Sequence, residues 1–393
     1  MFKRHRQKLP VQSLPIRKPR NRYRHSLQQI LLTAVFAGGL SSAAQAVEGP
    51  DIAAKTQAEA AAAANIEDSR AAHLQQINQQ FAATVVIPTY QTLAEQTAQL
   101  ALAGAAFELA PTAANLASLQ DAWLAAELTW AKSSAFEFGP VHSLGYGPAI
   151  ASPLDATGVD LLLAQLTEVE ESAQPDYLAE AAIHPSMKGL AAIAYVLHHA
   201  DAPQENGSRT ASGFYPAERV YLSYLTAEAQ VAAAALLDVW QVGWNDYPAY
   251  ATVLANAGNP DNAIDISTRS GTEEIIRGVI NSLDVVVNEE LPGLIAAPEQ
   301  IATDNLDLQI LNSTLRGIQL ASQSTGFAEL IKSDSNQNQQ IQQSLETATT
   351  LIAAAHDQPQ EPAVIAFALT VALESLQIAH TLLGNDVLPL AQE

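Results

Sequence analysis

Apolar residues recur every three or four positions along most of the chain, the spacing of one face of an α-helix. Ala, Leu, Gln and Glu, which favour helices, dominate, and few stretches alternate with a period of two. We therefore expect an all-α protein whose helices end at Pro, Gly and Asn/Asp clusters. One such stripe, with steps of three and four, consists of Leu116, Leu119, Trp123, Leu124, Glu127 and Trp130.

The positions of these Pro, Gly and Asn/Asp clusters predict that the helices form two tandem bundles. The first covers residues 47–255, the second covers residues 272–393, and a Gly- and Asn-containing linker, residues 256–271, joins them. Residues 138–153 are rich in Gly, Pro and aromatic residues and are expected to form a loop. The predicted helices are 53–81, 88–110, 111–130, 155–171, 175–199, 216–244, 272–297, 304–331, 335–356 and 360–384.

The first 46 residues have the three parts of a secretory signal peptide. A basic head contains nine of the 19 Lys and Arg residues and no Asp or Glu, an apolar run follows at residues 30–40, and the segment ends in Ala44-Gln45-Ala46. The apolar run is shorter than the roughly 20 residues that span a bilayer. We expect cleavage after Ala46 and a periplasmic protein.

Removal of this segment would leave a strongly acidic protein. Residues 47–393 hold ten Lys and Arg residues against all 41 Asp and Glu residues, a net charge of −31. Such a surface repels nucleic acid and anionic lipid headgroups, so we expect no nucleic-acid partner. The chain has no Cys. It therefore has no disulfide, thiol nucleophile or Cys metal site, and a buried core must stabilise the fold.

Three segments are candidates for chemistry, although each also has a purely structural interpretation. Residues 130–140 form an aromatic helix end that runs into a Gly-Pro turn, which could be a hydrophobic cap. In residues 188–199 a helical pattern contains Gly189 and ends in two His residues, which could simply complement the helix dipole. In residues 312–318 Arg316 interrupts an apolar helix, which could reflect an internal salt bridge.

Together these segments resemble the imelysin-like family of exported bacterial proteins, whose members fold as two helical bundles. Residues 136–140, Phe-Glu-Phe-Gly-Pro, look like the family segment that ends in Phe-Gly-Pro. Residues 188–197 look like the region around its G-x-H-x-x-E motif. The helix with Asn312, Arg316 and Gly317 resembles a late family helix with Asn and Arg-Gly. The resemblance covers most of residues 47–393 and keeps the segments in order.

The sequence departs from the family at the G-x-H-x-x-E motif. Gly189 is present, but Ala191 occupies the His position and Ala194 the Glu position. An imidazole and a carboxylate three residues apart on a helix can ligate a divalent metal, and the Glu can act as a base, whereas methyl groups do neither. One compensation is that His198, on the same helix face, and Glu137 form a metal site.

The resemblance implies a non-catalytic binding protein linked to iron or metal uptake, with iron or zinc as the candidate ion and peripheral association with a membrane uptake system. The alternatives are a metallopeptidase of the imelysin type, which the two Ala residues disfavour, and a helical scaffold for a peptide or protein partner. The expected binding residues are Phe138, Gly139, Pro140, Lys188, Gly189 and Arg316, and the expected metal ligands are His198 and Glu137.

Overall fold

The computed structural model describes residues 50–198, 204–205, 208–299, 305–323, 336–357 and 361–392. The predicted signal peptide, residues 1–46, lies outside the described residues. The chain divides into two compact units, residues 1–62 and 63–393. Regular structure in the described part is helical apart from two short antiparallel hairpins, which confirms the all-α prediction. The hairpin strands are β1 (Gln204–Glu205), β2 (Ser208–Arg209), β3 (Gly243–Trp244) and β4 (Tyr247–Pro248).

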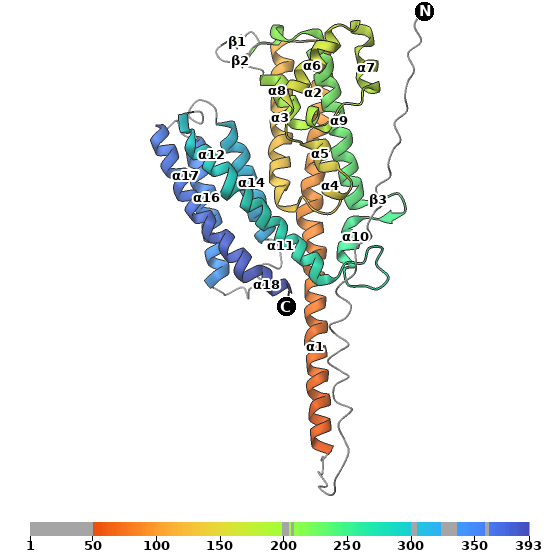
Figure 1. Cartoon of the computed structure of the whole chain (residues 1–393), viewed down its shortest axis with the longest axis vertical. Helices are drawn as coiled ribbons and strands as arrows, with labels where there is room; N and C mark the ends of the chain where they lie inside the picture. Colours follow the sequence, from red (N-terminus) through yellow and green to blue (C-terminus); the bar gives the residue numbers. More distant parts are fainter. Residues whose placement is uncertain are drawn as a thin grey trace, which may run out of the picture. The chain divides into compact units, whose positions relative to one another are not determined.

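Within residues 63–393, the first half of the chain is built around the long helix α2 (Ile87–Leu109), which packs against both α3 (Ala113–Ser133) and α9 (Pro216–Gln241) (Figure 1). Helix α8 (Gly189–His198) packs on α9 and α3. The other elements of this half are α1 (Pro50–Phe81), η2 (Ser134–Phe136), α4 (Pro140–Ser143), α5 (Tyr146–Ile150), α6 (Ala156–Thr167), η3 (Glu171–Ala173), α7 (Gln174–Glu180), η4 (Pro185–Met187), η5 (Ala211–Gly213) and α10 (Tyr250–Ala255).

The second half consists mainly of four helices, α11 (Thr268–Val285), α14 (Leu306–Gln323), α16 (Asn336–Asp357) and α17 (Pro362–Leu382). Helix α16 packs against α14 and α17. The short helices are α12 (Leu291–Ala296) and α18 (Leu388–Gln392). By length and composition alone, α9 and residues 362–392 could each cross a membrane, but α9 is the central helix of its group, and core helices share these properties.

A π-turn continues the helix through Pro88, where the sequence predicted a break between two helices. The same kind of turn occurs at two further places. The turns are η1 (Ala82–Val86), η6 (Val286–Glu290) and η7 (Leu383–Val387), and each precedes an Ile-Pro or Leu-Pro pair. At the first, the Ile87 N–H donates to the Ala82 carbonyl, five residues back. Because Pro has no N–H and its ring crowds the carbonyl four residues earlier, a widened turn lets the helix continue through it.

The helix predicted over residues 175–199 is instead divided into α7, η4 and α8. His184 and Lys188 have extended backbones on either side of η4, and Gly189 begins α8 with φ +76° rather than lying inside a helix. A side chain at Gly189 would also collide with the Ile150 carbonyl. Residues 138–153, expected to form a loop, contain the short helices α4 and α5.

The two halves approach closely where α14 lies on α3. Gly317 faces the Lys132 carbonyl so closely that a Cβ would not fit, and Ser313 Oγ donates to the Leu128 carbonyl at 2.5 Å. One hydrophobic cluster runs from Phe81 to Ala391 through both halves. The predicted division into bundles at residues 256–271 stays a prediction.

Candidate functional site

The segment that follows α3 buries two rings and leaves a carboxylate between them. Phe136 and Phe138 are almost fully buried. Phe136 packs edge-on against Tyr90, with ring centroids 5.7 Å apart, and Phe138 against Trp240, at 5.9 Å. Glu137 is only half-buried and lines a pocket. The Phe-Glu-Phe pattern thus anchors this segment in the core while presenting one acid to the pocket.

Position 139 requires glycine, because its backbone conformation and its neighbours leave no room for a side chain. Its φ is +57°, and a Cβ would lie 2.6 Å from the Tyr250 ring. The Tyr250 hydroxyl donates to Glu274 at 3.2 Å, and the Gly139 N–H also donates to Glu274. Pro140 is buried and begins α4. Glu274 on α11 therefore links the Phe-Gly-Pro turn to the second half of the chain.

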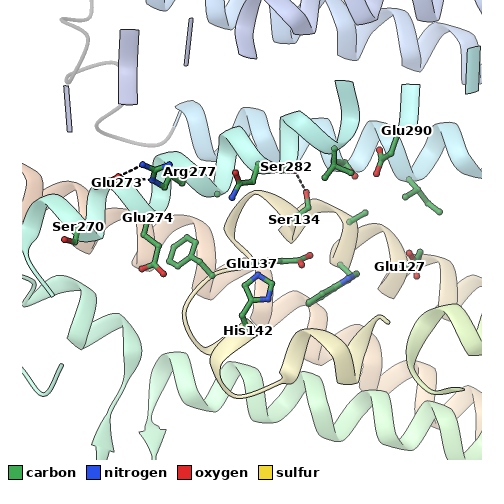
Figure 2. Close-up of a pocket in the computed structure, with 18 residues that line it drawn as sticks. Glu127, Ser134, Glu137, His142, Ser270, Glu273, Glu274, Arg277, Ser282 and Glu290 are labelled. Atoms are coloured by element: carbon green, nitrogen blue, oxygen red, sulfur yellow. Dashed lines mark hydrogen bonds and ion pairs between the residues drawn. The ribbon is translucent and has the colours of Figure 1, made fainter. Parts of the chain in front are cut away.

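The pocket lies along one face of α11 and has a volume of about 730 Å³ (Figure 2). The α11 residues that line it recur every three or four positions, so they share one side of the helix. Side chains from α3, from the segment after η2 and from α14 form the other walls. The lining residues are Glu127, Trp130, Ala131, Ser134, Glu137, Phe138, His142, Ser270, Glu273, Glu274, Arg277, Gly278, Asn281, Ser282, Val285, Glu290, Ile310 and Thr314.

Four carboxyl groups in this pocket have raised pKa values. Burial raises the pKa of both Glu127 and Glu137 to about 7. Burial also raises the pKa of Glu274, against the opposing effect of its hydrogen bonds with Tyr250 and Gly139. Burial is also the main cause of the raised pKa of Glu290, and nearby acidic side chains raise this pKa further. These groups are therefore easier to protonate than ordinary surface carboxylates.

Positive charge in the pocket is already paired. The Arg277 Nε and Nη2 atoms both donate to Glu273, at 2.8 and 2.6 Å, and Gln392 also donates to it, which lowers the pKa of Glu273. His142 lies at the rim and is exposed. Ser134 and Ser282 are hydrogen bonded at 2.7 Å and connect η2 to α11 (Figure 2).

The structure places the expected metal ligands apart. His198, at the end of α8, is exposed and packs edge-on against the Trp123 ring at 5.4 Å, and it does not line the pocket that contains Glu137. Among the described residues, no group of three or more His, Asp or Glu side chains could hold a metal ion. The metal-binding role of His198 and Glu137 stays a prediction.

The other expected binding residues lie in two further places. Lys188 forms an ion pair with Glu228 at 2.7 Å and lies over the Tyr224 ring, so it fastens the start of α8 to α9. Ala191 and Ala194 are half-buried on the same helix. The pocket brings together only Glu137 and Phe138 from the expected set, with Gly139 and Pro140 adjoining them.

Arg316 is exposed and lines a smaller pocket of about 240 Å³ with Asn312 and His356. No ion pair within the described residues involves Arg316, so the internal salt bridge considered for it is not formed there. Asn312 is buried and donates to the Thr349 carbonyl at 3.2 Å, which connects α14 to α16.

Four pocket carboxylates, Glu127, Glu273, Glu274 and Glu290, were not among the residues expected from the sequence. Glu127 could have been recognised from the sequence, because it is the one acid in an apolar stripe and burying an unpaired charge costs free energy. Glu273, Glu274 and Glu290 have no comparable feature. Their shared pocket depends on α11 packing against segments about 140 residues earlier in the chain.

Fold and pocket together define an all-helical protein with an acidic, partly apolar cavity. The family model described as Imelysin matches residues 86–378, and the chain belongs to the imelysin family. It is 32% identical over 222 residues to iron-regulated protein A of Synechococcus elongatus, an alignment that covers 56% of this chain and about half, 55%, of that protein.

Two crystal structures share the fold. One, from Parabacteroides distasonis, is described as an iron-regulated protein A precursor; it has a TM-score of 0.59 and 18% identity, covering 79% of this chain and 93% of that one. The other is an imelysin-like protein from Psychrobacter arcticum, with a TM-score of 0.59 and 17% identity, covering 82% and 96%.

Proposed function

We propose that this chain is an exported imelysin-family protein that binds a ligand rather than cleaving peptides, in a process linked to iron or metal uptake. The observation that carries the proposal is the pocket along α11, a cavity of about 730 Å³ with carboxylates distributed along it. Its size is that of a small-molecule site, and its charge favours a cationic ligand.

A binding role is favoured over peptidase chemistry by the residues on α8. Ala191 and Ala194 stand where the family motif has the His and Glu that could hold a metal and activate water. Among the described residues, no group of three or more His, Asp or Glu side chains gathers closely enough to hold a metal ion. The described residues therefore do not fit a resident metal ion.

The link to iron is supported by the relative from Synechococcus elongatus, whose name describes regulation by iron. Export is supported by the basic head, apolar run and Ala44-Gln45-Ala46 ending of residues 1–46. In the periplasm the protein would act beside a membrane uptake system, to which we expect it to bind peripherally.

A deletion and complementation experiment in the encoding organism tests this role. Growth under iron limitation should fall when the gene is deleted and recover with the wild-type gene. The double variant Glu127→Gln/Glu137→Gln should not restore growth. Glu168→Gln, at an exposed position outside the pocket, should restore it. No growth defect, or full recovery with the double variant, would overturn the proposal.

Two measurements on purified residues 47–393 complete the test. The protein should leave insulin and other peptides intact, with or without added zinc, and cleavage would show a peptidase. Calorimetric titration of the metal-stripped protein with ferrous, ferric and zinc ions should show only weak, salt-sensitive uptake. Saturable binding that is lost in His198→Ala would instead establish the metal site predicted from the sequence.

A further inference from the structure

The lining of the α11 pocket contains more negative charge than its own cations can balance. Arg277 is paired with Glu273, whereas the carboxyl groups of Glu127, Glu137 and Glu290 form no hydrogen bond or ion pair with the described residues. Glu127 is partly exposed because it lines the pocket, and protein atoms surround its carboxyl elsewhere. Unpaired acids in such surroundings are costly unless a bound cation offsets them.

The carboxylates are spread along the pocket instead of converging on one point. Glu274 and Glu290 are sixteen residues apart on α11 and its π-helical continuation, which corresponds to about 24 Å at 1.5 Å per residue. In Figure 2, Glu290 lies on the α11 side of one end of the pocket and Glu127 on the opposite side of that end, and Glu137 lies between this end and Glu274. A single metal ion could not satisfy this distribution, but a long ligand with several positive groups could.

Apolar surfaces lie between the carboxylates. Trp130 and Phe138, each less than a tenth exposed, present their remaining surface to the pocket, and Val285 and Ile310 also line it. These side chains suit methylene groups, and the aromatic faces also attract cations. The hydroxyl group of Thr314, on α14, can accept hydrogen bonds from an ammonium group.

From these observations we infer that the α11 pocket binds a linear aliphatic amine with two or more ammonium groups, which lies along α11 with its charges on the separated glutamates. The inference rests on the proposed binding function and names the chemical class of the ligand. The bound amine would place one ammonium group at the end of the pocket lined by Glu127 and Glu290 and another farther along, between Glu137 and Glu274, and its methylene chain would contact Trp130.

Calorimetric titration of the full chain tests this assignment, with 1,4-diaminobutane and spermine as probes in 0.15 M sodium chloride. Butylamine tests the need for more than one charge, and magnesium chloride tests attraction by charge alone. Saturable binding should strengthen from butylamine to the diamine to spermine. Trp130 fluorescence should change with the same midpoint.

Variants separate the pocket from the acidic surface. Glu127→Gln/Glu137→Gln should weaken spermine binding by about tenfold or more, because two charged contacts are lost. The matched control Glu95→Gln/Glu168→Gln removes the same charge from exposed positions outside the pocket and should leave the affinity within about twofold, the size of a weak surface effect. Equal weakening by both pairs would assign the binding to the general surface charge and overturn the inference.

The pH dependence adds an independent check. The groups that face the ligand are Glu127, Glu137, Glu273, Glu274, Glu290, His142 and Arg277. Affinity should rise between pH 6 and pH 8 as Glu127 and Glu137, whose pKa values burial raises to about 7, become ionised. Affinity that falls over this range, or no amine binding at all, would contradict the inference. A growth defect under iron limitation in that case would leave the proposed function standing. Amine binding without a growth defect would overturn the proposed role in iron uptake and leave the ligand assignment standing.

Discussion

Glu127 shows how one acidic side chain can lower the stability of the folded chain. Its pKa is about 7 in the folded protein, against an ordinary value near 4.5, because burial disfavours the charged form. Below pH 4.5 the carboxyl is protonated in both folded and unfolded chains and costs nothing. As pH rises from 4.5 to 7 the unfolded chain loses its proton first, so stability falls, and above pH 7 the full penalty remains.

We therefore predict that Glu127→Gln stabilises the protein at pH 8 and much less at pH 5. The gain in the free energy of unfolding at pH 8 should be roughly 1–3 kcal/mol. Urea denaturation at both pH values measures it, with Glu168→Gln as the exposed control. An equal gain in the free energy of unfolding at pH 5 and pH 8 would mean that burial does not raise the pKa of Glu127.

The residues of the pocket were only partly predictable from the sequence. Glu137 was predicted as a metal ligand through its place beside the Phe-Gly-Pro turn, whereas Glu127 was counted only as a member of an apolar stripe. The helical spacing of α11 also shows which of its residues share a face. It does not show that this face meets η2, because that contact joins Ser134 and Ser282 across 148 positions of the chain. A pocket made by long-range packing has no local signature.

At the scale of elements, it was easier to predict that the elements are helices than to predict where each helix begins and ends. Helical residues recur over long stretches, and this established the all-α class. Pro88 was expected to begin a new helix, yet a π-turn carries the helix through it, and Pro292 and Pro389 repeat this arrangement. At Gly189 the reverse occurred, because a positive φ begins a helix where the sequence predicted a helix interior.

The close approach of α14 to α3 depends on Gly317, and Gly317→Ala should be destabilising. A Cβ there would collide with the Lys132 carbonyl of α3, which is backbone and cannot move without separating α3 from α14. Overpacking of this kind costs about 1–3 kcal/mol. Gly293→Ala is the matched control, since Gly293 lies in α12 with open space around it, and Ala should stabilise that helix slightly. Equal unfolding midpoints for the two variants would contradict close α3–α14 packing.

At the scale of the whole molecule, the amino-acid composition predicts the net charge and the self-repulsion that follows from it, but it does not predict which helices pack together. The two halves share a continuous hydrophobic cluster, and α14 packs on α3. No local pattern in either helix specifies that pairing, because each apolar stripe would suit several partners. The net charge, in contrast, depends on counting alone. Residues 47–393 carry ten basic and 41 acidic residues, so self-repulsion is present whichever helices pair.

We predict that sodium chloride raises the melting temperature of the protein near pH 8. Added salt shortens the Debye length from about 30 Å at 0.01 M to about 10 Å at 0.1 M, which screens repulsion between carboxylates that have few Lys or Arg partners. Differential scanning calorimetry measures the change, and a gain of about 1 kcal/mol corresponds to roughly 2 °C in a chain of this size. The same series near pH 4 is the control, because protonation there removes much of the charge and the salt effect should shrink. A melting temperature that falls with salt at pH 8 would mean that the few ion pairs, such as Arg209 with Glu218, contribute more to stability than the net repulsion costs.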